Sequence, residues 1–134
     1  MTAKLTTHTY GITRTVSSGF AETIARLRDL LKEEGFGVLT EIDVQRTLKE
    51  KIDRDIEPYV ILGACNPAFA ARSIELEPDM GLLLPCNVIV SRRGGTTHVG
   101  VINPQSIVEA TANLALAEIA VQVDERLRRV LEKL

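Results

Sequence analysis

The sequence predicts an α+β domain, built as a single mainly antiparallel sheet of about five strands with helices packed on it and a long C-terminal helix. Two observations favour this class. A hairpin signal at residues 92–97 joins two strand patterns, so these strands run antiparallel. The last part of the chain has the apolar spacing of a long helix that can cover a sheet. A parallel α/β sheet is the alternative, because strands and helices alternate up to residue 90, but its last crossover would be missing.

The chain has the size and composition of one domain. Hydrophobic residues make up 45% and charged residues 25%, and no linker or repeat divides residues 1–134. Residues 1–7 are polar and are expected to be frayed. The net charge of −2 and the aromatic content of 4% disfavour a nucleic-acid partner.

Localisation follows from what the chain lacks. No apolar run approaches the roughly 20 residues that cross a bilayer. The first residues also lack the apolar core of a signal peptide. We therefore expect a cytoplasmic protein with no membrane partner, in which both cysteines are thiols.

The first strand and helix follow from alternation and then from helical spacing. His8–Val16 alternates between larger residues and mostly threonine, which is typical of a half-buried strand. A break follows, and Gly19 is a candidate N-cap for the next helix. Gly35 is placed to end that helix in the left-handed conformation. The apolar residues at helical spacing between them are Phe20, Ile24, Leu27 and Leu31.

A second strand leads into a short helix. Residues 36–42 alternate again, and one face of this strand would carry Phe36, Val38, Thr40 and Ile42. Asp43 is well placed as the N-cap of the following helix. The apolar stripe of that helix is Val44, Leu48 and Ile52. The charged run Lys49–Glu57 is expected to face solvent.

The apolar run Tyr59–Ala64 predicts a strand that is buried on both faces. It turns at Asn66-Pro67 into a short helix that reaches about Ile74, because Asn is a preferred N-cap and Pro a preferred first helical residue. Cys65 therefore lies between a central strand and a helix start, where free backbone N–H groups point. This corner is the best candidate site in the sequence.

The third part of the chain contains the hairpin and the last helix. Leu82–Ser91 is a second apolar strand and carries Cys86. Gly94-Gly95 supplies the positive φ angles of a tight turn, and His98–Ile102 is the returning strand. Asn103-Pro104 repeats the Asn-Pro corner, and one helix is expected from about residue 105 over most of the remaining chain.

The two thiols are the first candidate pair. If their strands are antiparallel neighbours, Cys65 and Cys86 meet at one edge of the sheet, whereas in a parallel sheet they lie at opposite ends. A close pair beside a helix N-terminus could bind a soft metal or cycle as a disulfide. The alternative is that both are small buried hydrophobic residues, since the chain has no Cys-x-x-Cys spacing.

The other polar candidates have structural explanations beside functional ones. Asn66 fits a helix cap, and the same corner could hold an anion. Asp43 fits a cap as well, and pairing with Glu41 for acid–base chemistry would need a convergence that sequence alone does not show. His8 and His98 have no metal-ligand spacing. The chain also lacks the usual nucleotide-binding, zinc-protease and hydrolase motifs.

Three motifs resemble those of one family. They are Gly63-Ala64-Cys65-Asn66-Pro67, Gly81-Leu82-Leu83-Leu84-Pro85-Cys86-Asn87 and Glu41-Ile42-Asp43. Together they are similar to the bacterial and archaeal family known as domain of unknown function three-hundred-and-two, over nearly the whole chain. The resemblance implies a compact α+β fold like that of the TATA-binding protein, a homodimer, and no established activity.

These observations lead to one functional hypothesis and two alternatives. The first is a small dimeric α+β module that binds a small ligand or a metal near Cys65, Asn66 and Cys86, with Asp43 as a further candidate ligand-binding residue. The second is a thiol enzyme that uses Cys65 as a nucleophile or redox centre. The third is an interaction module without a small-molecule site. Whether the protein is an enzyme, and with which cofactor, is left open by the sequence.

Overall fold

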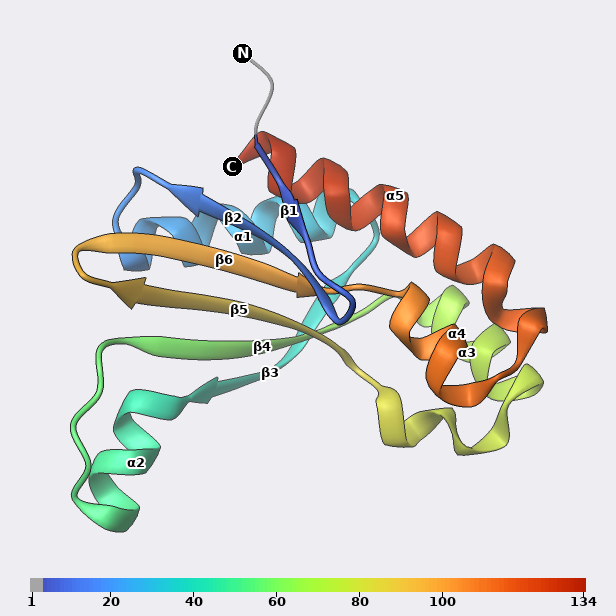
Figure 1. Ribbon diagram of the computed structural model, residues 1–134, viewed down its shortest axis with the longest axis horizontal. Coiled ribbons are helices and arrows are strands. Elements are labelled where there is room, and N and C mark those ends of the chain that lie inside the picture. The colour runs from blue at the N-terminus through green and yellow to red at the C-terminus, as the bar shows by residue number, and fades with distance from the viewer. Residues whose placement is uncertain (1–3) are drawn as a thin grey trace.

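The computed structural model describes residues 4–134, which contain one six-stranded antiparallel sheet in the order β1-β2-β6-β5-β4-β3 (Figure 1). The strands are β1 Thr6–Thr7, β2 Gly11–Val16, β3 Gly37–Asp43, β4 Tyr59–Cys65, β5 Cys86–Arg93 and β6 Thr96–Ile102. The predicted α+β class and antiparallel sheet are confirmed, but the predicted count of about five strands is wrong. The additional strand is β1, which pairs with β2 and lies within residues 1–7, the stretch expected to be frayed. Residues 1–3 lie outside the described part of the chain.

The helices lie mainly on one face and at one end of the sheet (Figure 1). They are α1 Phe20–Glu33, α2 Val44–Ile52, α3 Pro67–Leu76, α4 Gln105–Thr111 and α5 Ala117–Lys133, with 3₁₀ turns η1 Pro78–Leu83 and η2 Leu114–Leu116. Helices α1 and α5 pack on the sheet, α3 and α4 gather at one end, and α2 stands apart beyond β3 and β4.

The core forms between α1, α5 and alternate residues of the strands. Leu62 of β4 lies opposite Val88 of β5, which lies opposite Val101 of β6, so these side chains share one face. All three are buried against Leu127 and its neighbours from α5. The period-two alternation that predicted strands therefore selects the core residues.

Helix α1 begins and ends as the sequence predicts. Gly19 is its N-cap, and Gly35, at φ +85°, follows its last residues. The N–H of Phe36 donates to the carbonyl of Leu31 at 2.8 Å, and the N–H of Gly35 donates to that of Lys32 at 3.0 Å. These are the two bonds of a Schellman motif, which needs a residue with positive φ.

The single helix predicted from about residue 105 is wrong, because the chain leaves the helical conformation at Ala112, whose φ is +52°. Local side-chain hydrogen bonds stabilise this break. The Asn113 side chain accepts from the Ala115 N–H at 3.0 Å and donates to the Leu76 carbonyl at 3.0 Å. Asn favours such caps over helix interiors. The long C-terminal helix is therefore α5 alone.

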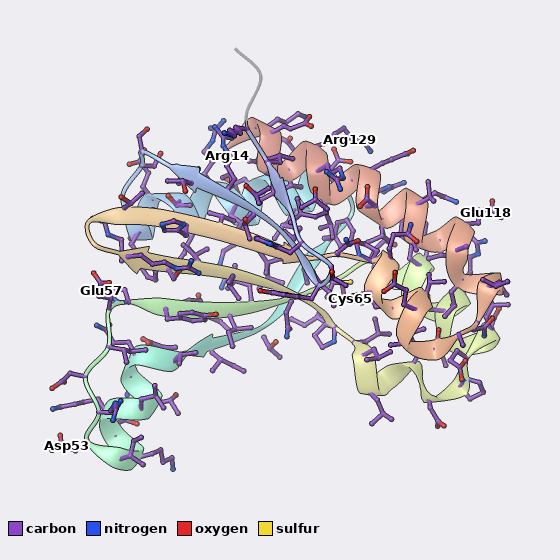
Figure 2. All side chains as sticks on the ribbon, in the orientation of Figure 1. Arg14, Asp53, Glu57, Cys65, Glu118 and Arg129 are labelled. Carbon is purple, nitrogen blue, oxygen red and sulfur yellow. The ribbon has the colours of Figure 1, made fainter. Side chains whose placement is uncertain are left out.

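Two arginines hold the end of α5 against the body of the protein. Arg14 of β2 donates to the carbonyl of Leu131 at 2.6 Å, and Arg26 of α1 donates to that of Lys133 at 2.7 Å. Carbonyls in the last turn of a helix lack the usual N–H donor four residues further on, and that of Leu131 otherwise accepts, within residues 4–134, only from the Leu134 N–H at 3.4 Å. A cation at a helix C-terminus is also favoured by the helix dipole. The place of Arg14 beside α5 is visible in Figure 2.

The alternation predicted for residues 36–42 is only partly correct. A bulge between Val38 and Thr40 shifts the register, so Val38 does not share a face with Thr40 and Ile42. Phe36 is buried in the core, whereas Ile42 is 49% exposed. Asp43 caps α2 as predicted, accepting from the Arg46 N–H at 3.0 Å, but no residue of α2 is buried.

The sheet face turned away from α1 and α5 is called the open face below. The strand registers place its members on one side, alternating with the core residues. They include Gly11, Thr13 and Thr15 of β2, Thr40 and Ile42 of β3, Tyr59, Ile61 and Gly63 of β4, Asn87, Ile89, Ser91 and Arg93 of β5, and Thr96, His98, Gly100 and Ile102 of β6.

Candidate functional site

The structure brings the two cysteines to the same end of the sheet. Strands β4 and β5 are antiparallel neighbours, and Ala64 lies opposite Cys86, one residue before Cys65. Both thiols are half-buried and line one cavity. Figure 2 shows Cys65 where the sheet gives way to α3 and α4. Of the two arrangements that the sequence left open, the structure has the antiparallel one.

The turn after Cys65 is built by Asn66 and Pro67, as the sequence predicts. The Asn66 side chain accepts from the Phe69 N–H at 3.2 Å, and Pro67 is the first residue of α3. Asn66 also lies against Gly35, where a Cβ atom would be 2.9 Å from the Asn66 side-chain nitrogen. The amide of Asn66 therefore caps α3 and lies beside the residue that ends α1.

Arg126 of α5 fixes the same corner from the other side. Its guanidinium lies over the Phe69 ring, 5.0 Å from the ring centroid, and donates to the Glu34 carbonyl at 2.9 Å. A cation over an aromatic face adds to the packing of the ring. Helix α3 is thus connected to α5 and to the end of α1, which keeps the cavity wall in place.

The cavity has a volume of about 60 Å³ and lies where two hydrophobic clusters meet. The main core lies on one side, and a smaller cluster of Met80, Val108, Leu116 and Ala120 lies on the other. The remaining walls come from five elements and the adjoining loops. They are Phe36, Ala64, Cys65, Asn66, Phe69, Ala70, Ser73, Leu84, Pro85, Cys86, Pro104, Ile107, Ile119 and Val123.

The side-chain oxygens of Asn66 and Ser73 in these walls are already hydrogen-bonded within the protein. Asn66 accepts from Phe69, and the Ser73 hydroxyl donates to the Phe69 carbonyl at 2.7 Å. The two thiols are weak hydrogen-bonding groups. The cavity therefore offers apolar contacts and two sulfur atoms to a molecule that enters it.

Burial raises the pKa of the Cys86 thiol from 9.0 to about 11, with a smaller contribution from the neighbouring Cys65. Cys86 is consequently a neutral thiol at physiological pH. Only the thiolate is a nucleophile, so this shift lowers its reactive fraction about 100-fold. The geometry supports the predicted closeness of the two thiols, whereas the pKa opposes high reactivity of Cys86.

At pH 8 we expect iodoacetamide to modify Cys86 of the native protein about 100-fold more slowly than in denaturant, because both its thiolate fraction and its access are reduced. Peptide mass spectrometry at timed intervals measures both rates. Equal rates in the native and denatured protein would show that the thiol is not held in this environment.

The same shift makes the free energy of unfolding depend on pH. The Cys86 pKa is higher in the folded than in the unfolded chain, so its contribution is fully present below about pH 9 and is lost as the pH rises toward 11. Two pKa units correspond to about 3 kcal/mol. Urea unfolding across this range measures how steeply the free energy of unfolding falls with pH. The fall should be shallower in Cys86→Ala than in the native sequence, and Cys65→Ala is the control.

The other predicted site residues lie elsewhere or have structural roles. Asp43 is at the far end of β3, opposite Val60, whereas Gly37 lies opposite Cys65. Val60 and Cys65 are five positions apart in β4, which places Asp43 about 17 Å along the sheet from Cys65. Figure 1 shows the same separation, because α2 begins beyond the end of the sheet that is remote from α3. Asp43 therefore does not contribute to the cavity.

Sequence reasoning missed the wall formed by η1, α4 and the start of α5. Met80 adds a third sulfur-bearing side chain to the cavity lining. No helical or strand periodicity marked Met80 in the sequence, because it lies in a short 3₁₀ turn. Among residues 4–134, no group of three or more His, Cys, Asp and Glu residues is placed to hold a metal ion.

The fold and the cavity define the class: an antiparallel α+β protein with an apolar, thiol-bearing cavity between the sheet and its terminal helices. The family model described as "Domain of unknown function DUF302" matches residues 12–134. The chain belongs to this family, as the sequence resemblance implied.

A solved structure and the curated proteins complete the comparison. The chain is similar to the crystal structure of the uncharacterized conserved protein DUF302 from Bacillus stearothermophilus, with 41% identity and a TM-score of 0.86. The match covers 92% of this chain and 96% of the other. No curated protein matches the chain. In the described part of the chain, none of the helices has the length and apolar character needed to span a membrane.

Proposed function

We propose that this protein is a small homodimeric module that binds a small uncharged ligand, or the apolar end of a larger one, at Cys65, Asn66 and Cys86. The observation that supports this proposal is the apolar cavity, in whose wall the Asn66 side-chain oxygen and the Ser73 hydroxyl are already hydrogen-bonded. Binding sites of this kind are largely apolar, with few polar groups. The neutral Cys86 thiol also favours an uncharged guest over an anion.

The cavity volume limits the ligand. A cavity measured in this way needs roughly 10 to 15 Å³ to hold one water molecule, so about 60 Å³ encloses only a few heavy atoms. The enclosed part is thus a small group such as a short alkyl chain. Any larger part of the ligand would lie outside, beside the half-buried Cys65 and Asn66.

Filling the cavity tests the proposal. Ala70 of α3 lines the cavity, and the side chain of Ala70→Leu would occupy it, whereas the neighbouring Ala71 is exposed. Native mass spectrometry reports ligands retained on purification, and amide NMR shifts report binding of xenon or short-chain alcohols as probes. We expect Ala70→Leu to lose the retained ligand and to weaken probe binding at least about tenfold, because the leucine side chain excludes the guest.

Ala71→Leu is the matched control, since it adds the same side chain to the same helix outside the cavity. It should bind the probes as the native protein does. Probe binding that is equal in Ala70→Leu and the native protein would contradict the proposal. The same spectra give the mass of the native assembly, which tests the homodimer separately.

A thiol enzyme that uses Cys65 is the second candidate function. It is favoured by one observation: Cys65 is half-buried in the cavity wall and immediately precedes the N-cap of α3. Cys65→Ser separates the two candidates, because it preserves the cavity and removes the nucleophile. Unchanged ligand affinity in this variant would exclude a thiol role in binding.

A further inference from the structure

Residues 105–116, which comprise α4 and η2, cover one side of the cavity and are called the lid below. Figure 1 shows α4 beyond the end of the sheet, next to α3. Of the twelve lid residues only Val108 and Leu116 are buried, and both belong to the smaller hydrophobic cluster instead of the main core. Leu114 is apolar and yet 81% exposed. A segment that buries so little apolar surface opens at a smaller free-energy cost than the core.

The side chain of Asn113 hydrogen-bonds the lid to the end of α3. Its Nδ2 atom donates to the Leu76 carbonyl at 3.0 Å and to the Glu77 carboxylate at 3.2 Å. Its Oδ1 atom accepts from the Ala115 N–H at 3.0 Å, which leaves Nδ2 to face the two acceptors. In the part of the chain that the structure describes, every other side-chain hydrogen bond of the lid stays within residues 103–116.

Both ends of the lid are held by the rest of the protein. Before it, the Asn103 side chain donates to the His8 carbonyl at 3.1 Å, and the Asn103 N–H donates to the Tyr10 carbonyl at 3.0 Å. After it, Ile119 and Ala120 are buried in α5. A segment with two fixed ends opens by separating from α3 and η1 in its middle, where Asn113 lies, and this separation uncovers the cavity.

We propose that the lid opens as one unit to admit the guest, and that Asn113 is the latch that holds it closed. This inference rests on the proposed ligand-binding function and describes how the cavity of that function is reached. A guest in the closed cavity touches lid residues and main-core residues at the same time, so it makes contacts that the open state lacks. By linkage the guest therefore favours the closed lid.

Hydrogen–deuterium exchange of the full chain, followed by peptide mass spectrometry, measures the opening of the lid. Lid amides of the native protein should exchange at least about tenfold faster than the amides of β4 and β5, which open only with the whole fold. A short-chain alcohol, added as the probe, should slow the exchange of the lid because it binds the closed state.

Asn113→Asp tests the latch separately from the cap. The carboxylate keeps an acceptor for the Ala115 N–H, but it loses both donors and lies against the Glu77 carboxylate. Loss of two hydrogen bonds, one of them to a charged group, should raise the exchange of the lid about tenfold or more. Asn87→Asp is the matched control, because it makes the same change at an exposed position of the open face and should leave lid exchange as in the native protein.

Glu77→Ala is a second variant, and circular dichroism shows whether each variant is folded. It removes one of the two latch bonds and should give an intermediate rate of lid exchange. Native-like exchange in both latch variants would overturn the role of Asn113, and lid amides as slow as those of β4 would overturn the lid itself. In both cases the cavity proposal stands if the native protein binds the probe. A native protein that binds no probe, although its lid opens, overturns the proposed function and the admission of a guest together.

Discussion

Replacing Leu127 by alanine is expected to lower the free energy of unfolding by about 2 to 5 kcal/mol. Leu127 lies in α5 and is fully buried in the main core between the helix and the sheet. The loss combines the transfer free energy of the removed atoms with the cavity that they leave. Urea unfolding followed by circular dichroism measures the change, with Val121→Ala as the control.

Val121 is in the same helix but 47% exposed, so its truncation removes few contacts and should change stability by less than about 0.5 kcal/mol. A loss of the same size in both variants would show that burial does not govern the effect, since alanine has the higher helix propensity and propensity alone would produce no loss. Comparison within one helix therefore isolates the contribution of the core.

Replacing Gly63 by valine should have the second largest effect and should also change the site. A Cβ atom here would overlap the Thr40 hydroxyl and would lie 2.7 Å from Cγ of Pro85. Overpacking of this kind typically costs about 1 to 3 kcal/mol. Gly63 is two residues before Cys65, and Pro85 immediately precedes Cys86, so the clash displaces both thiols.

We therefore expect Gly63→Val to unfold at lower urea and to expose Cys86, which should react faster with iodoacetamide. Gly37→Val is the matched control. Gly37 also lies in a strand of the sheet, but nothing lies within 4 Å of its Cβ direction. An unchanged midpoint for Gly63→Val, or an equal loss in both variants, would rule out the predicted clash.

Where local sequence and tertiary packing agree, the fold could be predicted. The hairpin turn is an example, because Gly94-Gly95 adopts the positive φ angles that the sequence suggested. The caps Asn66 and Asp43 are others, since a cap depends on neighbours within three residues. The number of strands was missed because β1 has two residues, too few to show any period.

The site was harder to predict because its parts come from distant segments. The corner at Cys65 was recognised from local signals, and its proximity to Cys86 depended on strand pairing. The opposite wall depends on the break at Ala112, where the side-chain hydrogen bonds of Asn113 override a helical apolar pattern. Asp43 was proposed for the same site, but it lies at the other end of the sheet. The sequence signal for a helix cap is local and does not show at which end of the sheet the cap lies.

The pairing of β2 with β6 has a consequence for synthesis of the chain. Gly11 and Ile102 are 91 positions apart (102 minus 11), whereas β3, β4 and β5 each pair with the next strand in sequence. At about 5 to 20 residues per second, β2 leaves the ribosome roughly 5 to 20 seconds before its partner. The later strands can thus assemble as a meander first, and β2 joins the sheet only after β6 has left the ribosome.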